Sequence, residues 1–323
     1  MDKFAKKDFY YILWFAIIKL WVIKMKIMCV GQSAYDITLP LDHYPIENKK
    51  VRLENKVECG GGSASNCAYL LAKWGLETYF AGIIGNDYYG KQIKKEYNEA
   101  GVNTKYLQVS DKFKTTSSYI IANTSIGTRT ILTSRDKDIK MDLQDIDDEF
   151  DFILFDGYEK DFAMEVIRKN PNATTILDAG SLKEATLELA KVVDYVVCSH
   201  DFAEDLSKVK IDYDDFDSIV EAYQELKKQI KGNIIITLES YGCFTCANGL
   251  YKIIPSIKVK AVDSTGAGDI FHGAFVYGLA KDFDIEKTMR FANITGALSV
   301  ETIGSRLSIP ELERVEEKYY DTL

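Results

Sequence analysis

Short apolar runs alternate with amphipathic stretches along most of this chain, and this alternation constrains the fold more than any other feature. In the first third, strand-like segments at 26–30 and 79–84 alternate with helical patterns at 64–73 and 89–100. The alternation continues through strand candidates at 152–155, 174–177, 195–198 and 233–238 and helical patterns at 161–169, 181–190 and 217–230. Buried strands separated by amphipathic helices are typical of a doubly wound, mostly parallel sheet flanked by helices. We therefore expect one α/β domain over residues 25–323.

Two regions, about 37–58 and 114–135, interrupt the alternation. Within the second, Thr116 to Ala122 and Thr128 to Leu132 have the composition of antiparallel, half-exposed strands. In an open α/β sheet the ligand binds beyond the carboxyl ends of the strands, so a small antiparallel sheet inserted there would form a lid over it. The exposed edge of such a lid could also pair two chains into a homodimer.

Residues 1–24 differ from the rest of the chain. The aromatic and aliphatic run from Phe9 to Ile23 is short for a membrane span, and no small-residue cleavage site follows it. From Met25 onward, a strand that ends at Gly31 gives a common opening of an α/β enzyme. We therefore interpret residues 1–24 as an N-terminal extension and expect the working protein to begin at Met25.

The charge balance limits the partners that the chain can bind, and the cysteines indicate its compartment. Lys and Arg total 40 and Asp and Glu total 49, which gives a formal charge of -9 and argues against nucleic-acid and membrane-surface partners. The six cysteines lack the spacing of a disulfide framework, as expected for reduced thiols in the cytoplasm. Cys243 and Cys246 form one CxxC, but no second Cys or His pair accompanies it for zinc or redox chemistry.

The segment Asp263 to Asp269, with the sequence DSTGAGD, runs directly into an apolar helical pattern. At such a helix start the first backbone N–H groups are unpaired and the helix dipole is positive. Glycines let a phosphate approach this backbone closely, so the loop is predicted to form an anion hole. The chain has no GxxxxGK[ST] motif, so this is not a Walker-type loop.

Asp269 falls in the first turn of this helix, beside the predicted anion hole. A carboxylate there can accept the proton of an alcohol that attacks a γ-phosphoryl group. An acidic residue at a helix start can also simply complement the dipole. The complete seven-residue string favours the catalytic interpretation.

A second glycine-rich segment, Gly60 to Asn66, precedes another helical pattern. Its glycines permit close backbone approach, and Asn66 offers a donor and an acceptor to a polyol, although a tight turn before a helix would explain the same residues. Asp36 lies five residues after Gly31, at the expected carboxyl end of the first strand. Its carboxylate could accept two sugar hydroxyls, and the alternative is a helix or turn cap.

Together these motifs resemble those of the ribokinase, or phosphofructokinase-B, family of carbohydrate kinases, over nearly the whole chain from Met25. The first family signature resembles Gly61 to Asn66 followed by Gly82, Gly85, Asp87 and Gly90, and the second resembles Asp263 to Asp269 with Gly273. The resemblance implies a ribokinase-like sheet with a small antiparallel β lid. It also implies a group of sugar-binding residues, namely Asp36, Gly61, Gly62 and Asn66. In the same way it implies a general base, Asp269, and backbone N–H groups that stabilise the transferring phosphoryl group, at Gly266, Ala267 and Gly268.

The resemblance further implies where a nucleotide and a cation would bind. The ATP-binding turn would include Thr237 and Gly242, and Asn293 would lie beside the adenine. A monovalent cation, here K⁺, would lie in a loop formed by Asp263, Thr265, Gly304 and Ser308.

The chain departs from the family pattern at two places near the nucleotide. Where many relatives have Asn-x-x-Glu, associated with Mg²⁺ and phosphate, this chain has Ser199-His200-Asp201-Phe202, so Ser199 replaces the asparagine and the glutamate is missing. Mg²⁺ would then be held mainly by the nucleotide and water, with the nearby Asp201 or Glu204 as a further ligand. Glu239 replaces a small residue and places a carboxylate near the triphosphate or ribose. The segment Gly127 to Leu132 is similar to ketohexokinases within the family.

The expected function is ATP-dependent phosphorylation of a hydroxyl on a sugar or sugar derivative. The same fold could instead accept a nucleoside. The missing glutamate and Glu239 also leave open a non-catalytic metabolite-binding relative. A dinucleotide dehydrogenase is a poor alternative, because no GxGxxG follows the first strand.

Overall fold

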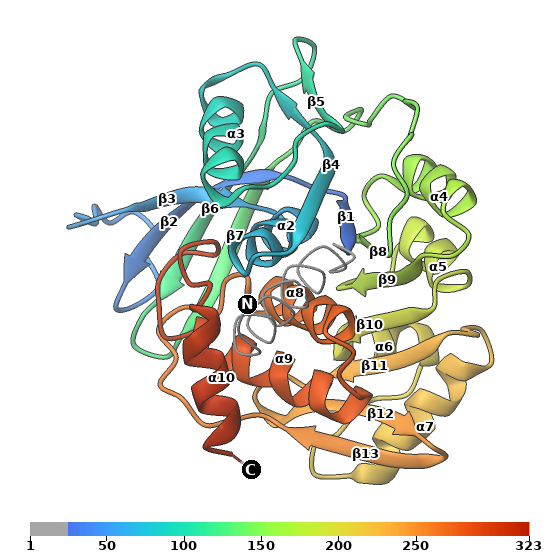
Figure 1. Cartoon of the computed structure of the whole chain (residues 1–323). Coiled ribbons are helices and arrows are strands. Elements are labelled where there is room, and N and C mark those ends of the chain that lie inside the picture. Colours follow the sequence, from blue (N-terminus) through green and yellow to red (C-terminus); the bar gives the residue numbers. More distant parts are fainter. Residues whose placement is uncertain (1–24, 323) are drawn as a thin grey trace, which may run out of the picture.

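A nine-stranded sheet forms the centre of the computed structural model, which describes residues 25–322 (Figure 1). Its strand order is β13-β12-β11-β10-β9-β8-β1-β4-β5. All neighbours from β11 to β5 are parallel, whereas β12 and β13 are antiparallel at one edge. The strands are β1 (Lys26–Val30), β4 (Glu77–Gly85), β5 (Leu107–Ser110), β8 (Phe152–Phe155), β9 (Thr174–Ala179), β10 (Tyr195–Ser199), β11 (Asn233–Thr237), β12 (Gly242–Ala247) and β13 (Leu250–Pro255). The predicted extension, residues 1–24, lies outside the described residues.

Helices cover both faces of the sheet and create two cores. On β1, Ile27 and Cys29 belong to one core and Met28 and Val30 to the other, as the two-residue period of a strand requires. The first face is covered by α2 (Ser63–Lys73), α3 (Tyr88–Ala100), α8 (Ala267–Ala280), α9 (Ile285–Ser299) and α10 (Leu312–Tyr320). The second is covered by α4 (Lys160–Lys169), α5 (Glu184–Ala190), α6 (His200–Ser207) and α7 (Phe216–Lys227). The predicted mostly parallel sheet flanked by helices is confirmed.

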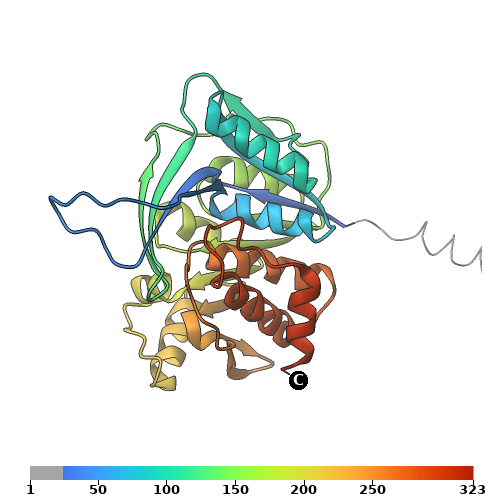
Figure 2. The same cartoon turned by 90° about the vertical axis from the view of Figure 1, so that its left-hand side faces the viewer.

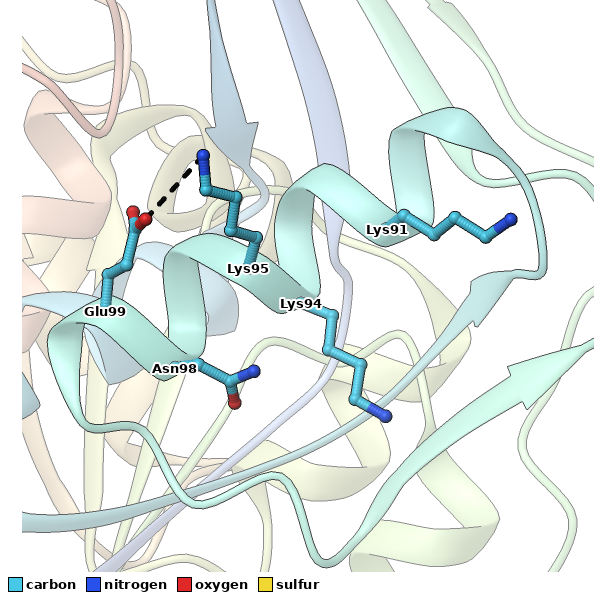
Figure 3. A pocket seen from close by; sticks show the side chains of 5 residues that line it. All are labelled: Lys91, Lys94, Lys95, Asn98 and Glu99. Atoms are coloured by element: carbon cyan, nitrogen blue, oxygen red, sulfur yellow. Dashed lines mark ion pairs between the residues drawn. The ribbon is translucent and has the colours of Figure 1, made fainter.

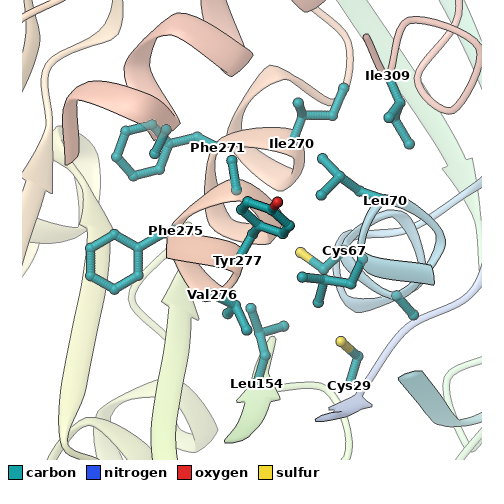
Figure 4. Packing of buried hydrophobic residues seen from close by; sticks show 14 of the residues in the cluster. Cys29, Cys67, Leu70, Leu154, Ile270, Phe271, Phe275, Val276, Tyr277 and Ile309 are labelled. Atoms are coloured by element: carbon teal, nitrogen blue, oxygen red, sulfur yellow. The ribbon is translucent and has the colours of Figure 1, made fainter. Parts of the chain in front are cut away.

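Helix α8 lies inside the first core rather than on its surface. Figure 4 shows its side chains packed among residues of α2, β1 and β8. Gly273 faces the Cα of Cys67 on α2, where an added Cβ would lie only 3.3 Å away, so the two helices approach closely. A helix that is apolar on all sides is buried, and this burial holds its N-terminus in a fixed place.

A second sheet of four strands, in the order β3-β2-β6-β7, contains both segments predicted to form a lid, and we call it the lid sheet or lid. Its strands are β2 (Ala34–Leu41), β3 (Val57–Gly61), β6 (Thr116–Asn123) and β7 (Thr128–Ser134). The two outer pairs are antiparallel, as expected, and the central β2/β6 pair is parallel. Figure 2 shows the lid at one side of the molecule, with the loop between β2 and β3 projecting away from the body.

The positions of the cysteines and the character of the helices bear on a shared metal site and on a membrane span. Cys243 and Cys246 lie on opposite faces of β12, in contact with different cores, so the two thiols cannot share a metal. All six cysteines are free thiols. Among residues 25–322, no helix combines the length and the apolar character needed to cross a membrane.

Candidate active site

The site lies beyond the carboxyl ends of the strands, where the chain order reverses between β1 and β8. Asp156 follows β8, and its Oδ2 accepts hydrogen bonds from the backbone N–H groups of Gln32 (2.7 Å) and Ala64 (3.2 Å). This carboxylate therefore ties the end of β1 to the start of α2. A Cβ on Gly31 would lie 2.0 Å from Asp156 Oδ1, so only glycine fits there. No motif in the sequence indicated this role of Asp156.

The predicted anion hole is the N-terminus of α8. Gly266 immediately precedes the helix with φ 77°, in the left-handed region that favours glycine. Gly268 is exposed, and no atom lies within 4 Å of the position a Cβ would take. The first N–H groups of α8 are thus open to an anion from solvent. The lid reaches this loop directly, because Arg129 Nη1 on β7 donates a hydrogen bond to Ser264 Oγ at 2.8 Å.

Asp269 lies in the first turn of α8 and faces α2. Its Oδ2 accepts a hydrogen bond from Asn66 Nδ2 at 2.8 Å, which joins the two glycine-rich motifs. Burial raises the pKa of Asp269, and the hydrogen bond from Asn66 and the charge of His272 oppose this effect. A carboxylate with a raised pKa is a better proton acceptor. Among residues 25–322, the buried Oδ1 of Asn66 has no hydrogen-bond partner.

Asp36 is not at the end of the first strand, as expected, but is the third residue of β2 in the lid. The chain leaves β1 and enters the lid strand within four residues, so the interval after Gly31 contains no helix. Asp36 Oδ2 accepts a hydrogen bond from Ser305 Oγ at 2.6 Å. Burial raises the pKa of Asp36 to about 6, and the nearby negative charge of Asp269 contributes in the same direction. The lid therefore brings a second carboxylate beside the proposed base.

The predicted glycine motif makes room for charged side chains. A Cβ on Gly61 would lie 2.0 Å from Asp36 Oδ2, and one on Gly60 would lie 2.0 Å from Arg306 Nη1. Gly62, with φ 97°, then starts α2. The sequence suggested that these glycines let a ligand approach the backbone. The structure shows that they also make room for the side chain of Asp36.

Most predicted nucleotide-binding residues come together at the ends of β10 and β11. Ser199 and Thr237 are paired across these strands, and Glu239 and Gly242 form the turn that follows. Ser199 Oγ caps α6 by accepting a hydrogen bond from the Phe202 N–H at 3.0 Å. Gly242 is required sterically, since a Cβ would lie 2.1 Å from the carbonyl oxygen of Ile254.

Asn293, on α9, lies against this turn, because it contacts the same Ile254 carbonyl that lies over Gly242. It is buried, and its Nδ2 donates a hydrogen bond to the Ile254 carbonyl at 2.8 Å. The side chain therefore fixes α9 against β13. The structure gives this residue a structural partner, and a contact with adenine stays a prediction.

Two acidic side chains lie near the position of the missing family glutamate. Glu204 is occupied, because Oε2 contacts Lys210 Nζ at 2.7 Å and Oε1 accepts a hydrogen bond from the Ile211 N–H. Asp201 is largely exposed and contacts His200 at 3.2 Å. Glu204 is thus engaged by protein partners, and a contact of either carboxylate with Mg²⁺ stays a prediction.

The four residues predicted for a monovalent cation are brought together. Asp263 Oδ1 accepts hydrogen bonds from the N–H and hydroxyl of Thr265, and its Oδ2 accepts one from the Gly304 N–H at 2.9 Å. The Ser308 N–H donates to the Gly304 carbonyl at 3.0 Å. The oxygen atoms of Asp263 and Gly304 already accept these hydrogen bonds, so binding of K⁺ by the four residues stays a prediction.

A shallow hollow on α3 is separate from all these residues. Its lining, shown in Figure 3, comes from a single helix and consists of Lys91, Lys94, Lys95, Asn98 and Glu99. Ligand sites usually draw buried side chains from several elements. This solvated helix face is therefore not the candidate site.

The family follows from a comparison with known proteins. Residues 24–312 match the family described as pfkB family carbohydrate kinase. The chain belongs to this family. The pfkB resemblance seen in the motifs and the expected enzyme class, a carbohydrate kinase, are therefore confirmed.

Relatives of this pfkB kinase span its whole fold. A ribokinase from Staphylococcus aureus is 29% identical over 308 residues, which cover 90% of this chain and 99% of that protein. A nucleoside kinase from Methanocaldococcus jannaschii is 23% identical, over 91% of this chain and 96% of that protein. The structure of Arabidopsis thaliana ribokinase complexed with ribose and ATP has a TM-score of 0.76 at 23% identity, covering 92% of this chain and 98% of that chain. The ribokinase fold is thereby confirmed.

This pfkB kinase also has a buried polar network that the motifs did not reveal. Arg306 is 2% exposed; its Nη1 contacts Glu96 Oε2 at 2.7 Å and its Nη2 donates a hydrogen bond to Ser65 Oγ. Glu96 Oε2 also accepts a hydrogen bond from the Gly60 N–H at 2.9 Å. The network joins the C-terminal loop, α2, α3 and the lid around the glycine motif. The sequence did not indicate the burial of Arg306, because this arginine stands in a polar stretch.

Replacing Arg306 with methionine should lower the free energy of unfolding by about 3 kcal/mol, because Glu96 would remain without its charged partner. Urea unfolding of the two proteins measures the difference. Arg314→Met is the matched control: Arg314 pairs with Glu301 at 2.6 Å but is half exposed. Its replacement should cost less than about 1 kcal/mol. Equal losses in the two variants would contradict the structural role of Arg306.

Proposed function

We propose that this protein transfers the γ-phosphoryl group of ATP to a hydroxyl group of a sugar or sugar derivative. Asp269 accepts the proton of that hydroxyl, and the N–H groups of Gly266, Ala267 and Gly268 stabilise the charge of the transferring phosphoryl group. One observation carries the proposal: Asp36, Asn66 and Asp269 lie together at the N-terminus of α8. A carboxylate pair beside an anion site is suited to bind an alcohol and a phosphate together.

The phosphoryl donor is proposed to be MgATP. The Arabidopsis relative, a ribokinase, is described as complexed with ribose and ATP. In this chain, Ser199 and Thr237 are paired at the ends of β10 and β11, and Glu239 and Gly242 lie in the turn that follows. Mg²⁺ bound to the nucleotide would neutralise phosphate charge, and Asp263, Thr265, Gly304 and Ser308 would hold K⁺. The residues of the protein then bind and orient the two substrates and exclude water from them.

The inner face of the lid supports a sugar as acceptor. Paired positions place Cys59, Asp36, Ser118 and Thr133 in one row across the four strands. Three of these side chains can hydrogen-bond to hydroxyl groups. The hydroxyl of the buried Thr116, in the next row on the same face, has no hydrogen-bond partner in the part of the chain that the structure describes. We therefore propose a polyhydroxylated acceptor.

A nucleoside is the second candidate, and a different row of the lid favours it. Val57, Thr38, Ile120 and Ile131 lie side by side next to the Asp36 row. Three of these four side chains are apolar and Ile131 is 45% exposed, so this strip could cover a base. The relative named as a nucleoside kinase agrees with this alternative.

An ADP-release assay with a panel of sugars and nucleosides tests the proposal. We expect D-ribose, the sugar named by the relatives, to stimulate ADP release more than adenosine does. Stimulation of ADP release by adenosine, and by none of the sugars, would favour a nucleoside kinase. Thermal stabilisation by the panel without any ADP release would favour a non-catalytic binding protein and contradict the proposed function.

Two further expectations stay predictions. The edge strand β7 is exposed along almost its whole length, as pairing of two lids in a homodimer would require. A cytoplasmic location is consistent with six free thiols.

A further inference from the structure

His272 is buried one helical turn after Gly268, directly beneath the anion hole. It is 4% exposed. Its Nδ1 lies 2.6 Å from the carbonyl oxygen of Gly268, and its Nε2 lies 3.0 Å from the carbonyl oxygen of Val197 on β10. The imidazole ring therefore bridges the first turn of α8 and the central sheet.

The two contacts of His272 indicate how many protons its ring carries. Both partners are carbonyl oxygens, which only accept hydrogen bonds, whereas a neutral imidazole donates from one nitrogen only. Both contacts are therefore hydrogen bonds only if the ring carries two protons and a positive charge. A buried charge needs a partner, and Asp178 Oδ1 on β9 lies 3.5 Å from Nε2. Asp178 is thus the carboxylate positioned to balance a charged ring.

The surroundings of this pair are mainly acidic. Burial raises the pKa of Asp178 to about 7, and the charge of His272 opposes this effect. The same charge opposes the rise in the pKa of Asp269. The other charged or titratable side chains that face these groups are Asp36 from β2, Cys67 from α2, Arg129 from β7 and Asp156 after β8.

We propose that His272 is a positioning residue that fixes the Gly268 end of the anion hole to the sheet and, as an imidazolium, keeps Asp269 ionised. The inference rests on the proposed function of Asp269 as the base. A histidine that only filled space between α8 and β10 would need neither two acceptors nor a buried carboxylate. Removing its charge should make Asp269 harder to ionise, since an opposite charge nearby favours the carboxylate.

The test is the pH dependence of kcat/KM with MgATP and D-ribose, or with the panel member that shows turnover. In His272→Gln, the acidic limb of the profile should move to higher pH by about one unit. His43→Gln is the matched control, because His43 is exposed in the loop between β2 and β3, and its profile should match the wild type. A lowered rate with an unmoved limb would mean a purely structural role and would overturn the proposal.

The double variant His272→Gln/Asp178→Asn covers the case in which the single variant does not fold. It removes both members of the buried pair, which proteins tolerate better than loss of one. Asp178 and His272 act on the pKa of Asp269 in opposite directions, so the acidic limb of this variant should move up by less than one unit. A limb that moves to lower pH would overturn the proposal.

The ring protons of His272 can also be observed directly in the wild-type protein. The chain has three histidines, so a ¹H–¹⁵N spectrum of the imidazole nitrogens is simple to assign with the variants above. Near neutral pH, both nitrogens of His272 should resonate as protonated nitrogens, and a neutral tautomer would contradict the imidazolium. If Asp269→Asn is inactive while the limb is unmoved in His272→Gln, only this inference fails. An active Asp269→Asn variant instead removes the base on which it rests.

Discussion

Replacing Asp269 with asparagine should lower kcat about a thousandfold, the range expected for loss of a general base. Asparagine keeps the size of the side chain and can still accept the hydrogen bond from Asn66. It cannot take the proton of the attacking hydroxyl. Because the change leaves the anion hole and the lid in place, the affinities for MgATP and sugar should change only a few-fold. Steady-state kinetics and equilibrium binding separate the two effects.

Asp145→Asn is the matched control for this variant. The Asp145 side chain is fully exposed and lies 3.6 Å from Lys169, remote from the motifs. It undergoes the same chemical change, and its kcat should equal that of the wild type. An Asp269→Asn enzyme within tenfold of wild-type kcat would show that another group, or water alone, removes the proton.

Replacing Asp36 with alanine should raise KM for the sugar about a hundredfold and leave KM for ATP unchanged. Two charge-assisted hydrogen bonds to sugar hydroxyls, at about 1.5 kcal/mol each, account for that factor. Ser305→Ala is the control, since it removes the hydroxyl that contacts Asp36 at 2.6 Å but keeps the carboxylate. If the two variants weaken sugar binding equally, Asp36 only orders the lid.

The pH dependence of sugar binding gives a second readout of Asp36. Burial raises its pKa to about 6. The carboxylate is therefore lost as the pH falls through about 6, and the sugar affinity of the wild-type protein should decline over that interval. An Asp36→Asn variant is neutral at every pH, so its weaker affinity should lack this decline.

The sequence allowed accurate prediction of the buried strands and their order of appearance. β1 and β8 occupy the expected residues 26–30 and 152–155, because uninterrupted apolar runs bounded by polar residues mark strands buried on both faces. Helix ends were less certain. α5 begins three residues later than expected, at Glu184, since Ser181 and Lys183 serve the turn before it.

The parts of the site that escaped prediction depend on contacts between distant residues. Arg306 and Glu96 are 210 positions apart, and His272 reaches Val197 from 75 positions away. Neither pair leaves a local spacing pattern. The prediction that Asp36 ends the first strand is wrong, because nothing between Gly31 and Asp36 signals that the chain turns at once into β2.

Product analysis with wild-type enzyme, MgATP and D-ribose tests the central claim most directly. Mass spectrometry should find one sugar phosphate for each ADP formed, and Asp269→Asn should form neither at a comparable rate. The proton acceptor and the polyol pocket would then both be supported. ADP release without a phosphorylated sugar, for D-ribose and every other sugar of the panel, would contradict phosphoryl transfer to a sugar hydroxyl at this site.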